Sequence, residues 1–305
     1  MAKCLSFHAP YRCRRSGACC SAGWNIPFDA AELQVVTALP PLSGRVRETS
    51  TGGAAVQDAG RCSFLGRDGD GAHACEIHLA GGHAALPLAC RMFPRLVLHD
   101  SRGTFISLSH FCPTAAALLF EADDEVTIVD APSPLAGTGW LDGLDARDVW
   151  PPLLRPGLMM DLDSYDLWER FAIALLTHEG VPARRALDAL DHATVRIAAW
   201  QPSPDRPLED TIREAIASVA LATSPVAYFE SAVKRWLAAR AFGSWIAYQG
   251  NGLRTIVRYL RSCYHTFEVE LARDDNPLEA IRRADHLIVH ESSSQRLANL
   301  LNVRA

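Results

Sequence analysis

Residues 13–20 read CRRSGACC: a single cysteine, five intervening residues and then two adjacent cysteines near the start of the chain. With four later cysteines they form the series Cys13-x5-Cys19-Cys20 and Cys62-x12-Cys75-x14-Cys90-x21-Cys112. Counting Cys4, eight of the nine cysteines precede residue 113, and only Cys263 lies later. Cysteines that serve only as small buried residues would be spread over the whole chain, so this clustering indicates a metal or redox site in its first third.

The composition indicates a folded protein that is long enough for one large domain or two moderate ones. Its 305 residues are 49% hydrophobic and 21% charged, which is typical of globular proteins. The net charge of −5 argues against a protein that binds nucleic acid through the phosphates. We find no apolar segment of a secretory signal and no apolar run long enough to cross a bilayer. We therefore expect a cytoplasmic protein with no nucleic-acid or membrane partner, in which disulfides are disfavoured.

The spacing of the cysteines favours a metal site. The sequence contains no CxxC pair, so neither a thioredoxin-type redox motif nor a zinc ribbon fits. A disulfide between the adjacent Cys19 and Cys20 would strain the peptide between them. Sulfur ligands select zinc or an iron–sulfur cluster, and a cluster is held by about four cysteines. Clustered thiols with only scattered histidines favour iron–sulfur, while His78 is the best histidine for the zinc alternative.

Basic residues accompany the clustered cysteines, and cationic neighbours favour the thiolate form that binds metal. The arginines beside the cysteines are Arg12, Arg14, Arg15, Arg61 and Arg91. Arg91 and Arg95 follow Cys90 and have two interpretations, which stay open here. In the first, these two arginines bind a cofactor carboxylate or offset the negative charge of a cluster. In the second, they form structural ion pairs. Cys4 and Cys263 lie outside the series and are predicted to be ordinary buried residues.

Local signals predict the elements that carry these cysteines. Asp29 and Glu32 form a capping-box pattern for a helix that ends at Pro40–Pro41. The run Asp68–Gly71 predicts a turn, and residues 95–110 alternate as a β-hairpin does. Beyond residue 150, apolar side chains recur at helical spacing. We therefore expect a mainly α fold, with an N-terminal cysteine-rich metal-binding domain (1–128) that contains a small β-hairpin, followed by a C-terminal helical bundle (150–305).

Three stretches carry a family resemblance: CRRSGACCSAGWNI from residue 13, CSFLGRDGDGAHACEIHLAGGHAALPLACRMFPR from residue 62, and SLSHFCP from residue 107. Over about residues 8–120 the chain resembles the cysteine-cluster family, described as zinc- or iron-chelating, that includes the flagellin lysine-N-methylases. The resemblance implies methyl transfer from S-adenosylmethionine to lysines of a protein substrate such as flagellin, and a 4Fe-4S iron–sulfur cluster. The ligands that it implies are Cys13, Cys19, Cys20, Cys62, Cys75, Cys90 and Cys112. Ser16 departs from the pattern, because many relatives have a further cysteine there.

The residues themselves identify no catalytic group. No strand is followed by a G-x-G-x-x-G loop, so no Rossmann-type cofactor site is predicted. The last amphipathic stretch contains Asp285, His286, His290 and Glu291. We favour a solvated polar face over a second metal site for these four residues. Core packing is favoured over a pocket for methylated lysine for the aromatic residues Trp236, Trp245, Tyr248, Tyr259 and Tyr264. Two other functions remain open, a non-enzymatic zinc- or iron-binding protein and an iron–sulfur redox protein.

Overall fold

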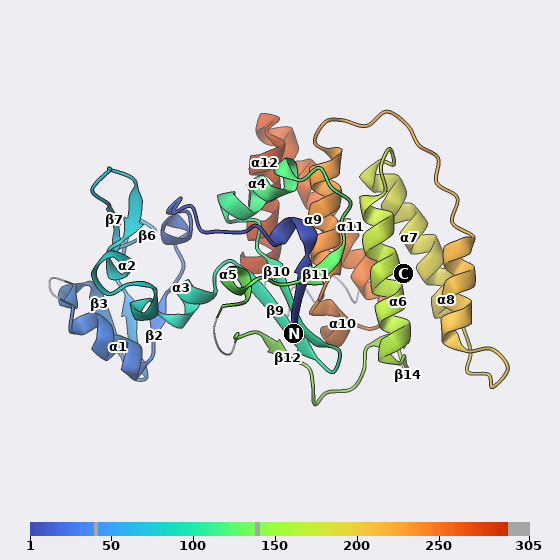
Figure 1. The fold of residues 1–305 in the computed structure, drawn as a ribbon, viewed down its shortest axis with the longest axis horizontal. Coiled ribbons are helices and arrows are strands. Elements are labelled where there is room, and N and C mark those ends of the chain that lie inside the picture. The colour runs from blue at the N-terminus through green and yellow to red at the C-terminus, as the bar shows by residue number, and fades with distance from the viewer. Residues whose placement is uncertain (40–41, 138–140, 292–305) are drawn as a thin grey trace. The chain divides into compact units, whose positions relative to one another are not determined.

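The computed structural model describes residues 1–39, 42–137 and 141–291, and the chain divides into two compact units (Figure 1). The cysteine-rich unit comprises residues 12–95 and 112–114 and is coloured from blue to blue-green. The helical unit comprises residues 1–11, 96–111 and 115–305. The first eleven residues therefore belong with the helices, and the chain leaves that unit at residue 12 and returns to it at residue 96.

The helical unit contains a five-stranded mixed sheet with the strand order β11-β1-β10-β9-β12. Its strands are β1 (Ala2–Leu5), β9 (Arg95–Asp100), β10 (Gly103–Leu108), β11 (Ile128–Asp130) and β12 (Leu144–Asp145). The neighbours β9 and β10 are joined by a two-residue turn, as the alternation over residues 95–110 predicts. β1 pairs parallel to β10 with Cys4 opposite Ile106, β11 pairs antiparallel to β1, and β12 pairs parallel to β9.

Helices make up most of the rest of this unit. They are α4 (Pro113–Glu121), α5 (Ser133–Ala136), α6 (Leu162–Thr177), α7 (Ala183–Ala198), α8 (Leu208–Ala217), α9 (Glu230–Ala241), α10 (Ile246–Gln249), α11 (Leu253–Asp274) and α12 (Pro277–Asp285). Shorter elements are the 3-10 helix η1 (Ser6–His8), the π-helix η5 (His286–Glu291) and the strands β13 (Leu153–Arg155) and β14 (Leu158–Met159). α11 packs against α7 and α12, α6 packs against α9, and α9 contacts β10. The core between them contains fully buried Trp168, Trp236 and Phe267.

The cysteine-rich unit is built from short strands and short helices. β2 (Pro27–Phe28), β4 (Gly52–Ala55) and β3 (Val46–Thr49) form one antiparallel sheet. β5 (Gln57–Asp58) pairs with β6 (Arg61–Cys62), and β7 (Leu65–Arg67) pairs with β8 (His73–Cys75). The helices are η2 (Cys19–Ser21), α1 (Ala30–Thr37), η3 (Ser43–Arg45), α2 (Glu76–Gly81), η4 (His83–Ala85) and α3 (Leu88–Met92). α1 ends at Thr37, and the predicted stop at Pro40–Pro41 lies outside the described residues.

The predicted fold class is wrong. The chain is 48% helix and 16% strand, and it contains a mixed five-stranded sheet where one small hairpin was expected. Across residues 1–39, 42–137 and 141–291, no group of three or more His, Cys, Asp or Glu side chains is placed to hold a metal ion, so the predicted metal-binding domain is not seen. β1 and β12 escaped prediction because they have only 4 and 2 residues, too few for a recognisable alternation.

The capping box predicted at Asp29 is present, and it connects two helices of the cysteine-rich unit. Asp29 Oδ1 accepts the backbone N–H of Glu32 at 2.8 Å, and Glu32 Oε2 accepts the backbone N–H of Asp29 at 3.1 Å. Glu32 Oε1 also accepts the backbone N–H of Leu88 at 2.6 Å and the guanidinium of Arg91 at 3.3 Å. One carboxylate therefore holds the first turn of α1 and the first turn of α3 together.

Replacing Glu32 by alanine removes the three bonds that its carboxylate accepts, while the bond from the backbone N–H of residue 32 to Asp29 is kept. We expect Glu32→Ala to lower the free energy of unfolding of this unit by about 2–3 kcal/mol, because the backbone N–H groups of Asp29 and Leu88 and the guanidinium of Arg91 lose their acceptor. Urea unfolding followed by circular dichroism measures the change. Gln34→Ala changes an exposed side chain on the same helix. It is the matched control and should leave the free energy of unfolding nearly unchanged. An equal effect of both substitutions would contradict the role given to the Glu32 carboxylate.

Candidate functional site

The seven clustered cysteines all lie in the cysteine-rich unit, and the two others do not. Cys13, Cys19, Cys20, Cys62, Cys75, Cys90 and Cys112 fall within residues 12–95 and 112–114. Cys4 and Cys263 belong to the helical unit and are fully buried there, as predicted for ordinary core residues. All nine cysteines are free thiols. The seven clustered cysteines and the two buried core cysteines therefore lie in different units of the chain.

Cys19 and Cys20 occupy the 3-10 turn η2, which packs against β6, the strand that ends at Cys62. The turn is closed by a bond from the Cys20 backbone N–H to the Gly17 carbonyl at 3.0 Å. Gly17 has φ = 73°, and a Cβ atom there would lie 3.2 Å from the His73 side chain. A glycine is needed at this position because the loop bends through the left-handed region while it passes close to β8.

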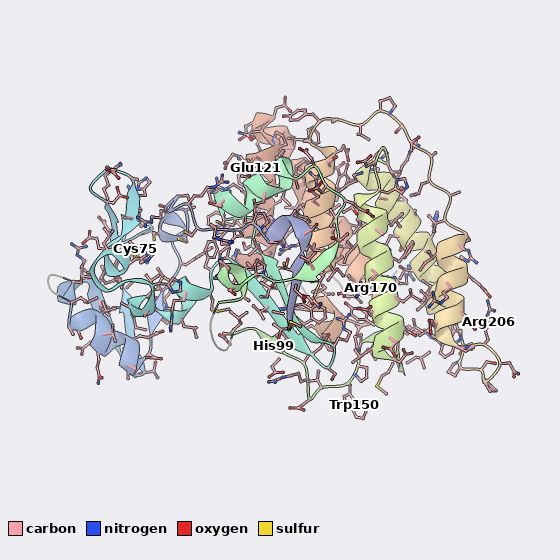
Figure 2. All side chains as sticks on the ribbon, in the orientation of Figure 1. Cys75, His99, Glu121, Trp150, Arg170 and Arg206 are labelled. Carbon is pink, nitrogen blue, oxygen red and sulfur yellow. The ribbon has the colours of Figure 1, made fainter. Side chains whose placement is uncertain are left out.

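Two hairpins and one helix position the other thiols. Cys62 lies opposite Gln57 in the β5–β6 ladder, and Cys75 lies opposite Leu65 in the β7–β8 ladder. Cys90 is in α3. Cys62 is 6% exposed and belongs to the core cluster of this unit, against which Cys20, Cys75 and Cys90 pack while partly exposed. Figure 2 labels Cys75, which precedes α2 at the end of β8.

The thiols interact electrostatically. The sulfur atoms of Cys19 and Cys20 are 3.9 Å apart, and the hydrogen bond between them lowers the pKa of Cys19 to about 7 and raises that of Cys20. Burial raises the pKa of Cys90, and the charges of Cys75 and Cys19 raise it further. Burial and the charge of Cys75 likewise raise the pKa of Cys62. One proton therefore leaves this group easily, but each further thiolate is opposed by its neighbours until a cation compensates it.

Five of the seven predicted ligands therefore lie in one cluster and interact electrostatically, although no three of the described cysteines are placed to hold one metal ion: Cys19, Cys20, Cys62, Cys75 and Cys90. Cys13 is exposed ahead of η2, and Cys112 is buried at 6% exposure in the same unit. His78, the candidate zinc ligand, lies in α2 three residues after Cys75. Burial and the nearby Arg15 lower the pKa of its imidazole, which favours the neutral form that binds metal.

Two of the arginines predicted to balance the thiolates, Arg15 and Arg91, pair with carboxylates. Arg15 lies 3.7 Å from Asp68, and Arg91 lies 3.3 Å from Glu32. The structural ion pair that was one of the two interpretations of Arg91 is therefore present. Arg91 Nε is buried, and no hydrogen-bond partner for it lies within the described part of the chain. The backbone carbonyl of Arg91 accepts a hydrogen bond from Nη1 of Arg95 at 2.9 Å, which ties the Arg95 side chain to α3. Cofactor binding by this pair stays a prediction.

Sequence reasoning missed a buried polar group in the helical unit. Asp285 is fully buried, so the interpretation of its surroundings as a solvated face is wrong for this residue. It accepts hydrogen bonds from the Ser109 hydroxyl and from the Trp236 indole, each at 2.8 Å. His290 is half-buried, with Nε2 2.7 Å from the Ser109 hydroxyl, and the Glu291 side chain lies outside the described residues. The only sequence signal was the polar pair Ser109–His110 at the end of an apolar strand.

In comparisons with known proteins, no family model, no curated protein and no solved structure matches the chain. The resemblance to the cysteine-cluster family therefore stays a prediction that rests on the motifs. None of the helices described is long and apolar enough to span a membrane.

Proposed function

We propose that the cysteine-rich unit binds a metal centre through its thiols, and that this centre is an iron–sulfur cluster. The observation that supports it is the clustering of one buried thiol and four partly buried thiols from η2, β6, β8 and α3, elements that are up to 71 residues apart in sequence (Cys19 to Cys90). Thiols placed so that they oppose one another's ionisation need a cation to become ligands together.

The donor set fits such a centre by its chemistry. It consists of sulfur alone, and soft thiolate ligands select iron–sulfur clusters or zinc over hard cations. Four thiolates suffice for a cluster, so the five gathered cysteines contain enough ligands, with Cys112 and Cys13 in the same unit. Zinc held by three of these thiols and His78 is the alternative. A cluster would supply one-electron chemistry, whereas zinc would supply stability to a unit whose strands have two to four residues.

Metal analysis of protein purified without oxygen tests the proposal. We expect iron and acid-labile sulfide in equal amounts, as the composition of an iron–sulfur cluster requires. Stoichiometric zinc without sulfide would select the zinc alternative. Neither metal, after reconstitution with iron and sulfide and after incubation with zinc, would contradict metal binding by this unit.

Serine substitutions identify the ligands. We expect Cys62→Ser and Cys90→Ser to lose most of the bound metal, because serine oxygen is a poor ligand for soft metals. Cys263→Ser is the matched control, since this thiol is fully buried in the other unit, and its metal content should equal that of the unmodified protein. Loss of metal in Cys263→Ser with retention in Cys62→Ser would overturn the grouping of the cysteines.

The lysine-N-methylase activity that the resemblance implies is a further prediction, with S-adenosylmethionine as the methyl donor and flagellin as the first substrate to test. Titration of the metal-loaded protein with S-adenosylmethionine, followed by mass spectrometry of flagellin lysines, measures it. Cofactor binding and methylated lysine would support the methylase. A loaded centre with neither would favour a redox protein or a metal-handling protein, both of which we predict to work in the cytoplasm.

A further inference from the structure

A cavity of about 350 Å³ lies within the helical unit, apart from the cysteines. It is bounded by the sheet, by the end of α9 and the loop after it, by α11 and by η5. The residues that line it are Leu96, Ser107, Ala239, Arg240, Phe242, Gly243, Ser244, Trp245, Ile246, Gln249, Tyr259, Ile288, Val289 and His290. Cavities of this size with apolar and aromatic walls and a few polar groups are typical of small-molecule sites.

The wall between α9 and α10 is held in place by contacts on both sides. Gly243 has φ = 56°, and a Cβ atom there would lie 2.8 Å from Cβ of Phe105, so only glycine fits. Its N–H donates to the buried carboxylate of Glu169 at 2.9 Å. The Trp245 indole, two residues later, donates to the Val97 carbonyl at 2.9 Å. These contacts fix the wall segment between α9 and α10.

The polar character of the cavity comes mainly from Arg240. Among the described residues that line it, none is an aspartate or a glutamate, and Arg240 is the one arginine. Arg240 is 5% exposed, and its Nη2 donates to the Leu108 carbonyl. Its Nε is buried, and no acceptor for it lies within the described part of the chain. A buried donor without an acceptor is unfavourable, so this N–H would gain from an oxygen atom brought by a ligand.

The carboxylate behind Arg240 does not meet this need. Asp285 Oδ1 is 3.6 Å from Arg240 Nη1, beyond hydrogen-bond distance, and Asp285 already accepts from Trp236, Ser109 and the Phe111 backbone N–H. Asp285 nevertheless lies close enough to offset part of the arginine's charge. That balance favours a ligand with a single negative charge over a phosphate dianion, which would face an excess of negative charge in a buried site.

Aromatic residues supply the rest of the recognition. Phe242 and Tyr259 are buried on the cavity wall, and Trp245, which also lines it, is 37% exposed. Flat ring systems stack on such side chains with little loss of entropy. We propose that this cavity binds a small planar aromatic molecule that carries one carboxylate, with the carboxylate on Arg240 and the ring against these aromatic residues.

Isothermal titration calorimetry with a matched pair of probes tests the proposal on the full chain. The probes are indole-3-carboxylate and indole-3-carboxamide, which share shape and differ in charge. We expect saturable binding of the carboxylate and binding of the amide that is about tenfold weaker or more, because hydrogen bonds to a charged group are the stronger ones. Equal binding of both probes, or no saturation of the carboxylate up to about 10 mM, would overturn the proposal.

Three variants locate the binding. Arg240→Gln removes the charge and should abolish the preference for the carboxylate, with circular dichroism showing whether the fold is kept. Gln249→Trp places a bulky group at an exposed lining position, where folding is not at stake, and should weaken both probes. Trp150→Ala, at the 78% exposed tryptophan labelled in Figure 2, changes a different cavity and should leave binding unchanged. If Gln249→Trp binds both probes as before and Arg240→Gln still prefers the carboxylate probe, the probes bind elsewhere. That result would contradict the proposed site.

Discussion

Asp285→Ala lowers the free energy of unfolding by about 3–5 kcal/mol, the range for removing one partner of a buried charge pair. Asp285 is fully buried at the end of α12, where its carboxylate faces the guanidinium of Arg240 at 3.6 Å. It also accepts from the Trp236 indole at 2.8 Å and from the Phe111 backbone N–H at 3.2 Å. Alanine leaves these donors without an acceptor and the buried arginine without a counter-charge, so two penalties act together.

Urea unfolding followed by circular dichroism measures this loss. Asp285→Asn should cost less, because its amide oxygen still accepts a hydrogen bond while the counter-charge is lost. The control is Glu209→Ala, which breaks the exposed i,i+4 pair with Arg213 on α8 and should change little. If Asp285→Ala costs no more than Glu209→Ala, the carboxylate does not hold the centre of the helical unit together, and the assignment of Arg240 as a compensated cation is wrong as well.

The parts of this structure that the sequence predicted are those decided by neighbours in the chain. The capping box needs only Asp29 and Glu32, three residues apart, and it forms as expected. The hairpin of β9 and β10 needs two alternating runs and a short turn, all within residues 95–108. α6, α7 and α8 likewise follow the apolar spacing of their own residues. In each case the physical cause lies within one local stretch.

The parts that could not be predicted depend on partners far away in the chain. β1 has four residues and becomes a strand because Ala2–Cys4 pair with Thr104–Ile106, about a hundred residues later. Asp285 reads as polar in any local window, yet it is buried because Ser109 and Trp236, on other elements, satisfy its oxygens. Helical periodicity does not reveal such a partner. The clustered cysteines could be singled out from the sequence, because their crowding into the first third of the chain is itself visible there.

Two fully buried histidines make the helical unit sensitive to acid. His8 Nε2 is 3.1 Å from Nε2 of His110, and both rings are inaccessible to solvent. Burial lowers the pKa of each imidazole well below its usual value. Arg240 lowers both pKa values further, and for His8 the neighbouring His110 does so as well, whereas Asp285 opposes the shift of His8. Both rings are therefore neutral in the folded protein, and a proton added to either would be a second buried cation beside Arg240.

Stability should fall as the pH falls below about 6.5, the pKa of histidine in an unfolded chain. Below that pH the unfolded state binds a proton at each histidine, while the folded state does not until its own lower pKa is reached. The free energy of unfolding then drops by up to about 1.4 kcal/mol per pH unit for each of the two groups. Above pH 7 both histidines are neutral in both states and contribute no slope. His290, whose pKa burial lowers to about 4, adds to the slope in the same direction.

Urea unfolding between pH 7.5 and pH 5.0 isolates this effect, because most carboxylates titrate below that window. His8→Gln should lower stability at pH 7.5 through lost packing, and it should also reduce the slope by about one proton. His265→Gln is the control, since it removes a histidine side chain that is 78% exposed on α11. A slope that His8→Gln does not alter would mean that His8 takes up its proton equally in both states. The pair would then be open to water, in conflict with its burial.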